Sequence, residues 1–240
     1  KDGAHPNESI RSPILFAYIA NLYSRNLFKN LEKVNSKKIL DVGCGRGIGR
    51  AKTFISNNCD YTGIDISEES IFHNIEEASM LNIKADFRVE DANTLSSLKG
   101  NTYDLIILTG TLHHLDIKVF MKNVKEITSS NGGKIIMNEP MGTNPFINLF
   151  RFLTPKLRSP DEHPLNFDDF KLIKKFFKNS TFELHTITSI LAIPFALIPS
   201  KRVKKFGQKL SVLLGKFDTL ISKLPIIKRL SWIVLITAKS

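Results

Sequence analysis

Short apolar runs alternate with longer amphipathic stretches through the first half of the chain. The runs at 38–42, 61–66, 85–89, 103–109 and 134–138 have the length and β-branched content of strands. The run 105–108, Leu-Ile-Ile-Leu, is apolar at every position, which indicates burial on both faces. The stretches 46–56, 67–81 and 117–129 repeat apolar residues every three or four positions and predict helices. Such an alternation predicts a mostly parallel sheet with helices on both faces.

The pattern changes on either side of this alternating region. Residues 12–34 carry a helical apolar repeat, and Ser12-Pro13 is a typical helix start. Five prolines punctuate 139–165, which predicts a cap or long loop. A helix at 168–178 and strands at 181–188 and 232–238 complete the expected fold. We therefore expect an N-terminal helical cap (1–36), a core (37–139), a proline-rich cap (140–166) and a C-terminal part of the core (167–240).

The last two predicted strands are separated by a basic insertion at about 190–230. Between 200 and 230, nine Lys and Arg residues face the single Asp218, so +8 of the net charge of +11 lies there. Within this insertion, 201–223 is amphipathic, and its predicted apolar stripe is Val203, Phe206, Leu210, Leu213, Leu214, Phe217, Leu220, Ile221 and Leu224. Three interpretations stay open, namely a helical lid, a helix on an anionic membrane surface, or a nucleic-acid patch. The sparse aromatic residues do not favour nucleic acid.

Composition narrows the class of protein only slightly. The chain has 240 residues, 42% apolar and 24% charged, which is ordinary for a globular protein. Its two cysteines, Cys44 and Cys59, lack metal-ligand spacing, so we expect neither a disulfide framework nor a metal site. No apolar run approaches the roughly 20 residues that span a bilayer. We expect a cytoplasmic protein, a monomer or homodimer, with peripheral membrane contact if the insertion binds lipid.

A turn with glycine at every second position follows the first strand. The segment 39–47 reads Ile-Leu-Asp-Val-Gly-Cys-Gly-Arg-Gly and leads into a helix, so its backbone can lie against a ligand. A dinucleotide site requires G-x-G-x-x-G, but Ile48 stands where the third glycine should be. The P-loop pattern G-x-x-x-x-G-K-[ST] is absent as well. The turn is therefore predicted to bind a cofactor of another class.

Residues 41–47 resemble motif I of the class I S-adenosylmethionine-dependent methyltransferases, of the small-molecule, type 11-like kind. The resemblance continues in order along the chain, through 63–67, 90–92, 103–107 with 112–115, and 132–136. It covers roughly 37–139. It implies a Rossmann-like, mostly parallel seven-stranded sheet flanked by helices, with an antiparallel last strand and, here, a helical cap or lid insertion. The implied cofactor is S-adenosylmethionine, the product is S-adenosylhomocysteine, and no metal is expected.

The resemblance assigns cofactor contacts to the carboxyl ends of the predicted strands, where open α/β sheets bind ligands. Asp65 would accept hydrogen bonds from both ribose hydroxyls, and Asp91 with Ala92 would bind the adenine. The expected cofactor-binding residues are Asp41, Gly43, Cys44, Gly45, Gly47, Asp65, Ile66, Asp91, Ala92 and Thr109.

Candidates for the reaction itself lie after the fourth strand and in the proline-rich cap. His113, His114 and His163 could act as a base or orient the acceptor, or they could be structural. Glu139, Arg151 and Arg158 could bind the substrate, and the two arginines would suit an acidic acceptor.

We expect a methyltransferase acting on a small, apolar or lipid-like acceptor. Two alternatives stay open: an RNA- or protein-modifying methyltransferase, and a non-catalytic membrane-associated module that binds S-adenosylmethionine. Thr109-Gly110-Thr111-Leu112-His113-His114 replaces the Asn/Asp-Pro-Pro-Tyr motif of amino-directed nucleic-acid enzymes, which counts against the first alternative. Acidic residues at 41, 65 and 91 count against the second.

Overall fold

The computed structural model describes residues 38–153, 155, 161–192, 195 and 198–240. The predicted helix at 12–34 and the cap at 1–36 lie outside the described residues, as does Arg158. The described chain forms two compact units. One unit includes Met141–Glu162 and Glu183–Val234, and the other includes the residues up to Pro140 with His163–Phe182 and Leu235–Ser240. No helix within the described ranges is long and apolar enough to cross a membrane.

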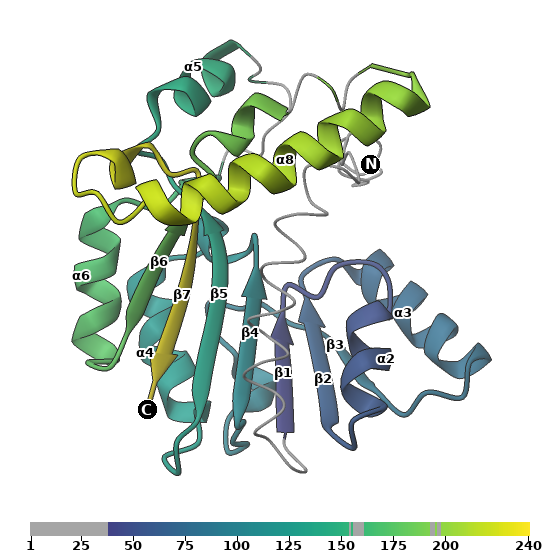
Figure 1. The fold of residues 1–240 in the computed structure, drawn as a ribbon. Helices are drawn as coiled ribbons and strands as arrows, with labels where there is room; N and C mark the ends of the chain where they lie inside the picture. The colour runs from purple at the N-terminus through teal and green to yellow at the C-terminus, as the bar shows by residue number, and fades with distance from the viewer. Residues whose placement is uncertain (1–37, 154, 156–160, 193–194, 196–197) are drawn as a thin grey trace. The chain divides into compact units, whose positions relative to one another are not determined.

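Seven strands form one sheet in the order β3-β2-β1-β4-β5-β7-β6 (Figure 1). Their bounds are Lys38–Val42 (β1), Asp60–Asp65 (β2), Asp86–Val89 (β3), Leu105–Thr109 (β4), Lys134–Pro140 (β5), Thr181–His185 (β6) and Ile233–Lys239 (β7). The pairs β1–β2, β1–β4, β2–β3 and β4–β5 are parallel. Figure 1 shows the arrow of β7 running opposite to the others. The predicted fold class is confirmed.

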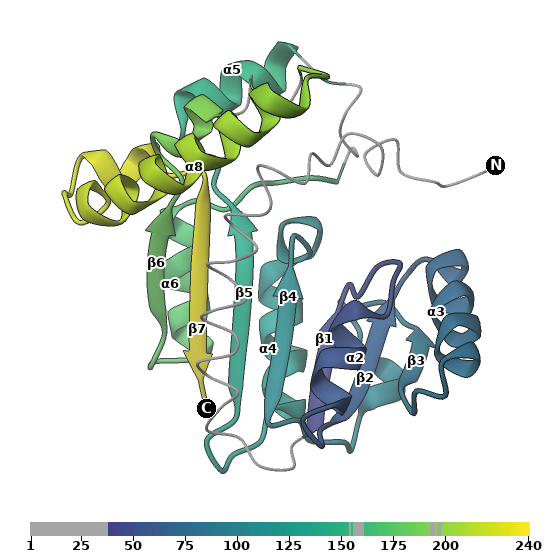
Figure 2. The ribbon, with the colours of Figure 1, turned by 45° about the vertical axis from the view of Figure 1, so that its right-hand side comes forward.

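The connections place helices on both faces of the sheet. From β1 the chain moves to β2 in one direction, and from β4 it moves to β5 in the other, so right-handed crossovers put their helices on opposite faces. The helices of the first half are Gly49–Ile55 (α2) and Glu68–Met80 (α3). Ile117–Ile127 (α4) and Phe167–Phe176 (α6) pack on each other on one face (Figure 2).

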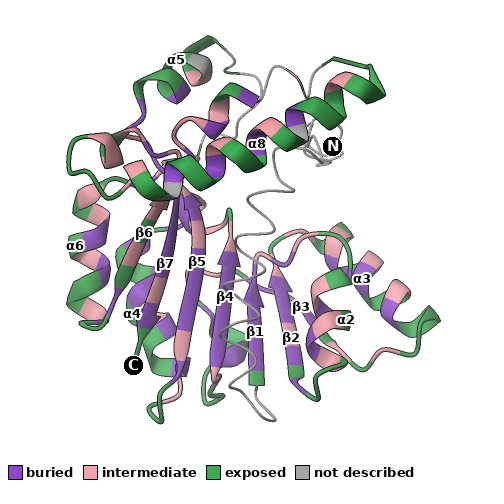
Figure 3. Ribbon diagram, viewed as in Figure 1, coloured by how far each residue is buried: buried purple, intermediate pink, exposed green. Residues whose placement is uncertain are grey.

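The sheet core is built from strands that are apolar on both sides. Ile39, Leu40 and Val42 of β1 are fully buried, and so are Ile106, Ile107 and Leu108 of β4 (Figure 3). These strands lie mid-sheet, where helices cover both faces. Asp41 breaks the apolar pattern of β1 and is equally buried. A buried carboxylate needs partners, and those partners organise the candidate site.

Local sequence signals set most helix starts. Ser67 accepts a hydrogen bond from the Ser70 amide and caps α3, and Asp116 caps α4 in the same way through Val119. Asn166 and Asp169 form a capping box on α6. The first helix, α2, begins at Gly49 and not at 46, because the turn before it still has left-handed backbone at Gly47.

The other compact unit holds the cap and the insertion. It contains α5 (Pro145–Leu153), the 3-10 turn η4 (Ser189–Ala192), the long helix α8 (Lys201–Ile221) and the 3-10 turn η5 (Ile227–Leu230). Among the described residues, the basic insertion thus contains a 21-residue helix, with a 3-10 turn before it and another after it.

Candidate functional site

The glycine turn after β1 has left-handed backbone, and two of its glycines border open space. Gly43, Gly45 and Gly47 have φ values of +67°, +61° and +112°. A Cβ added at Gly43 would lie 2.2 Å from Thr111 Oγ1, so this glycine is required for packing. A Cβ added at Gly45 or Gly47 would meet nothing within 4 Å. The second half of the turn is therefore an open cradle.

The end of β2 and the helix α3 hold this turn in place. The Gly45 amide donates to Asp65 Oδ2 at 2.8 Å, and the Ser67 amide donates to Asp65 Oδ1 at 2.9 Å. The fully buried Asn74 accepts from the Gly47 amide at 2.7 Å and donates to the Gly45 carbonyl at 2.8 Å. Sequence analysis missed Asn74. Its signal is a polar residue on the buried face of α3, between Ile71 and Ala78.

Asp41 lies beneath the turn in a buried polar network. Oδ2 accepts from the Tyr61 hydroxyl at 2.6 Å and pairs with Arg50 Nε at 2.9 Å. Arg50 also donates to Thr109 Oγ1 at 3.1 Å and to the Cys44 carbonyl at 3.2 Å. Burial raises the pKa of Asp41, while Arg50 and Tyr61 act to lower it. Oδ1 is buried and has no hydrogen-bond donor among the described residues.

Arg50 is the second residue that sequence analysis missed. It crosses from α2 to the carboxyl end of β4 and so connects Asp41 with Thr109, two of the predicted cofactor residues. A buried aspartate in an otherwise apolar strand requires a cationic partner, which was the available signal.

Cys44 is part of the wall of the site. Its thiol is buried, and burial together with the nearby Asp41 and Asp65 raises its pKa to about 12. At neutral pH it is therefore a protonated thiol and not a nucleophile.

Two apolar side chains are exposed at the same edge of the sheet, beside Asp65. Ile66 is 75% exposed and Val89 is 45% exposed. Asp65 and Val89 are paired across β2 and β3, so both apolar side chains lie at neighbouring strand ends. Exposed apolar groups at this edge offer a surface on which a flat base can lie.

Glu90 and Asp91, which follow β3, have different roles. Glu90 is buried and accepts from the Ser96 amide and hydroxyl and from the Ser97 amide, at 2.8–3.0 Å. Burial raises the pKa of Glu90, but these hydrogen bonds outweigh it and the pKa is lowered. Asp91 is exposed and receives the Asn93 amide on Oδ1 at 2.8 Å, and Ala92 beside it is half-buried. Glu90 thus fixes the loop, and Asp91 borders solvent.

Glu139 anchors the segment after β4. Its Oε1 accepts from the amides of Thr111 and Leu112 at 3.1 and 3.0 Å. Its Oε2 lies 2.7 Å from His113 Nδ1, and Glu139 is fully buried. Both oxygens of this predicted substrate-binding carboxylate are therefore engaged within the protein.

The three predicted histidines meet at the 3-10 turn η2 (Leu112–His114). The rings of His113 and His114 have centroids 4.1 Å apart, and the His163 amide donates to the His113 carbonyl at 2.8 Å. Cε1 of His113 is the nearest atom, at 3.9 Å, to a Cβ added at Gly110, so this ring edge faces the end of β4. The fold thus brings His163 next to His113, fifty positions earlier in the sequence.

Arg151, another predicted substrate residue, belongs to α5 in the other unit. It donates to the Met141 carbonyl at 3.3 Å and lies 4.0 Å from Glu162. Met141 and Glu162 belong to that same unit, and the role of Arg151 toward a substrate stays a prediction.

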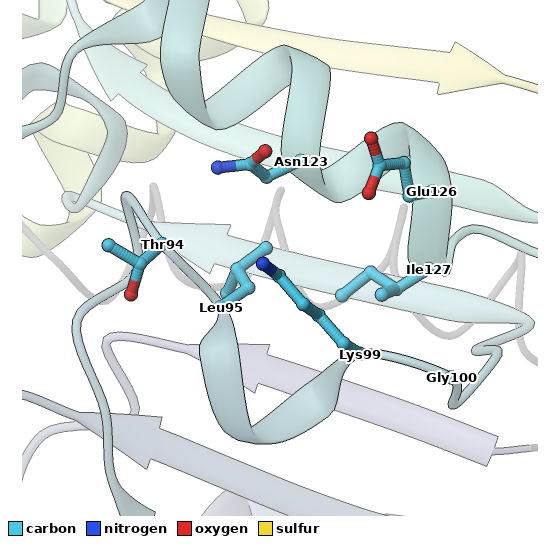
Figure 4. A pocket seen from close by; sticks show the side chains of 7 residues that line it. All are labelled: Thr94, Leu95, Lys99, Gly100, Asn123, Glu126 and Ile127. Carbon is cyan, nitrogen blue, oxygen red and sulfur yellow. The ribbon is translucent and has the colours of Figure 1, made fainter.

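A separate shallow pocket lies between the loop after β3 and α4 (Figure 4). Its volume is about 120 Å³, below the roughly 300–1,000 Å³ of most ligand pockets. Its lining residues are Thr94, Leu95, Lys99, Gly100, Asn123, Glu126 and Ile127, and none is a predicted site residue. Among the described residues, no group of His, Cys, Asp and Glu side chains could hold a metal ion.

The residues around the glycine turn fit S-adenosylmethionine. The cradle at Gly45 and Gly47 is open, a carboxylate stands at the end of β2, and apolar surface adjoins it. The unpartnered Asp41 Oδ1 can accept a hydrogen bond from a cationic ammonium or from a water molecule. No cluster of lysines or arginines is required, because this cofactor carries no phosphate.

Comparisons with known proteins agree with this fit. Residues 39–132 match a family model described as "Methyltransferase domain". Phosphoethanolamine N-methyltransferase 3 of Arabidopsis thaliana is 32% identical over 105 residues, covering 43% of this chain and 21% of the relative. Ubiquinone biosynthesis O-methyltransferase of Photobacterium profundum is 34% identical over 79 residues, covering 33% of each protein. The chain thus spans a third or less of these relatives.

Solved structures share the fold along nearly the whole chain. A SAM-dependent methyltransferase from Archaeoglobus fulgidus has a TM-score of 0.60 at 18% identity, covering 92% of this chain and 94% of its own. Coclaurine N-methyltransferase bound to N-methylheliamine and SAH has a TM-score of 0.58 at 14% identity, covering 91% and 72%. The matched segment contains the glycine turn, Asp65, Asp91 and Thr109. Residues 39–132 therefore match a methyltransferase domain, and the chain shares its fold with solved S-adenosylmethionine-dependent methyltransferases.

Proposed function

We propose that the chain is a methyltransferase that transfers a methyl group from S-adenosylmethionine to a small, apolar or lipid-like acceptor. The observation that carries the proposal is the open glycine turn braced by Asp65 within the matched domain. S-adenosylmethionine supplies an activated methyl group on a sulfonium. The protein must bind it, orient the acceptor and exclude water.

Each predicted cofactor residue has a role consistent with its position. Asp65 would bind the ribose hydroxyls, and Asp91 with Ala92 would bind the adenine, with Ile66 and Val89 as nearby exposed apolar side chains. The turn from Gly43 to Gly47, which includes the buried Cys44, would hold the amino-acid part. Arg50 connects Asp41 and Thr109 next to this turn.

Among the three histidines, we assign the role of general base to His113. If its Nδ1 carries the proton, that proton is donated to Glu139 Oε2 and Nε2 is left with a basic lone pair. Glu139 is then a positioning residue and not a direct substrate contact. His114 and His163 would orient the acceptor around this ring. A hydroxyl acceptor needs such a base, whereas an amine needs none.

The relatives and the cap both bear on the acceptor. The name of one relative indicates an amine acceptor, phosphoethanolamine, and the name of the other indicates a reaction in ubiquinone biosynthesis. In the predicted substrate cap, α5 exposes Phe146, Leu149, Phe152 and Leu153, which suits an apolar molecule. Since such a molecule partitions into lipid, a cytoplasmic protein in peripheral contact with an anionic membrane belongs to the same proposal.

Calorimetry with S-adenosylmethionine and S-adenosylhomocysteine tests the cofactor site. We expect Asp65→Ala to weaken both affinities about 10- to 100-fold, because a charge-assisted hydrogen-bond acceptor is lost. Asp60→Ala is the matched control, an exposed aspartate at the other end of β2, and should bind like wild type. Absence of binding by wild type, or equal affinity of Asp65→Ala, would refute the proposal.

The base assignment is tested by the tautomer and the rate together. Long-range proton–nitrogen NMR should show His113 protonated at Nδ1, and Glu139→Gln should disturb that signal. With catechol as a hydroxyl acceptor, His113→Ala should lower kcat about 100-fold or more, and His114→Ala far less. A protonated Nε2, or equal effects of the two substitutions, would contradict the assignment.

A further inference from the structure

The long helix α8 buries small residues and turns large apolar residues outward. Its buried positions are Gly207, Ser211, Gly215 and Asp218, which follow one another at helical spacing. A Cβ added at Gly207 would lie 2.7 Å from Phe195 Cβ, so Phe195 and η4 pack closely on this face. Close packing on small residues leaves the predicted apolar stripe only partly covered.

Within α8, the exposed part of that stripe is a row of four large side chains. Phe206, Leu213, Phe217 and Leu220 are each 50–66% exposed (Figure 3). Their spacing of seven, four and three residues puts them on one side of the helix. We call these four residues the outer stripe. Exposed apolar rows of this kind mark interaction surfaces.

The charge beside the outer stripe is of one sign. Exposed basic side chains of α8 are Lys201, Arg202, Lys204, Lys205, Lys209 and Lys216. At 100° per residue, Lys205, Lys209 and Lys216 all fall on the same flank of the stripe. The surface of α8 is therefore an apolar row with a cationic border.

Asp218, the only acidic residue of α8, is withdrawn from this surface. It is 1% exposed and accepts hydrogen bonds from the amides of Ile187, Thr188 and Ser189 at 2.6–3.1 Å. The hydroxyls of Thr188 and Ser189 also donate to it, each at 2.6 Å. This carboxylate binds the loop at 187–189 on the buried side of α8, so it does not lie at the exposed surface beside the lysines.

We propose that the outer stripe of α8 is a docking surface for an anionic lipid bilayer. Phenylalanine and leucine side chains enter the headgroup boundary while the flanking lysines meet anionic headgroups. A nucleic acid would use the lysines but leave the leucines in water, which is why lipid is the occupant that suits both features. The helix lies on the bilayer and does not cross it. This inference rests on the peripheral membrane contact of the proposed function and assigns that contact to named residues. Docking is measured without methyl donor or acceptor, so its failure is distinguishable from failure of the proposed reaction.

Vesicle sedimentation of the full chain tests the surface. We expect wild type to bind vesicles of phosphatidylcholine with phosphatidylglycerol and to bind phosphatidylcholine alone far more weakly. Replacing Leu213, Phe217 and Leu220 with serine should weaken binding about 10-fold or more. The matched control is Phe72→Ser with Met80→Ser on α3, which removes exposed apolar side chains from another helix and should bind like wild type.

Charge is tested in the same assay. Replacing Lys205, Lys209 and Lys216 with glutamine should weaken binding about 100-fold, from roughly fivefold for each lysine. The control replaces Lys118, Lys122 and Lys125 of α4, three exposed lysines, with glutamine and should have little effect. Circular dichroism and S-adenosylhomocysteine affinity establish that every variant is folded.

Several outcomes would overturn the inference. The first is a wild-type protein that does not bind anionic vesicles. The second is that the α8 variants bind these vesicles as tightly as their controls do. A stripe-dependent dimer without vesicle binding would assign the surface to a second copy of the chain. RNA binding that depends on the lysines but not on the stripe, again without vesicle binding, would assign it to nucleic acid.

Discussion

Asp41 shows how a single buried charge can organise a binding site. A carboxylate with no solvent exposure loses hydration that only charged or polar partners replace. Arg50 supplies the charge, Tyr61 supplies a hydroxyl, and the same guanidinium reaches Thr109 and the Cys44 carbonyl. Stability and the shape of the cofactor site therefore depend on one arginine.

We predict that Arg50→Met destabilises the protein by about 3 kcal/mol at neutral pH. The loss arises because Asp41 stays buried without its cation, and the 31% exposure of Arg50 keeps it at the lower end of the usual range. Without Arg50 the folded-state pKa of Asp41 rises further above its ordinary value of 3.8. A raised folded pKa costs stability as pH rises through it, so the deficit should shrink in acid.

Urea denaturation at neutral and acidic pH measures this effect. Arg46→Met is the control, since Arg46 and Glu69 form an exposed pair 3.4 Å apart that should contribute below about 1 kcal/mol. Adding Asp41→Asn to Arg50→Met should recover part of the loss. An Arg50→Met protein as stable as wild type would show that Asp41 does not depend on this pair.

At the residue scale, the sequence identified the carboxylates of the site but not the side chains that bond to them or to the turn. The motif identified Asp41 and Asp65, and the structure places both against the turn. Arg50 and Asn74 were not predicted because their contacts reach residues up to 59 positions away, which only the folded chain brings close. The bond between His113 and Glu139 spans 26 residues and was missed for the same reason.

At the element scale, apolar periodicity located the strands of the sheet but not every boundary. The predicted strand 181–188 ends at His185, because Thr186 takes a left-handed backbone with φ of +64°. The Thr, Ile and Ser residues of this segment give no sequence signal for a left-handed backbone at Thr186. The start of α2 moved for a similar reason, since glycine allows several turn lengths before a helix begins.

The largest element-scale difference concerns the inner face of α8. Periodicity correctly indicates an amphipathic helix over 201–223, and the structure has α8 at Lys201–Ile221. Periodicity left open whether the apolar stripe is covered by the protein or turned outward. The protein buries glycine, serine and a carboxylate of α8, because five hydrogen bonds to Asp218 and close packing on Gly207 fix that side. The hydrophobic pattern alone does not reveal that the hydrogen bonds of a buried carboxylate decide which side of the helix is buried.

At the scale of the whole molecule, the positive charge is concentrated in one of the two compact units. The basic insertion carries +8 of the +11 net charge and belongs to the unit that contains Met141–Glu162 and Glu183–Val234. The residues of the matched domain that the structure describes belong to the other unit. A docking helix can thus be modified without touching the cofactor residues.

We predict that Asp218→Ala loosens one unit and leaves the other intact. Ile187, Thr188 and Ser189, which donate to the Asp218 carboxylate, lie in the same unit as Asp218. Its removal leaves three amides and two hydroxyls without their acceptor. Each lost bond to a charged group is worth about 1.5–3 kcal/mol, part of which water restores. Hydrogen exchange in α8 and at 187–189 should therefore accelerate about 10- to 100-fold, while β1 and β4 keep their protection.

Asp168→Ala, which removes an exposed aspartate paired with Lys171, should change neither region. Equal acceleration in β1 and β4 would mean that the two units open together, and the separation of docking surface from cofactor site would then fail.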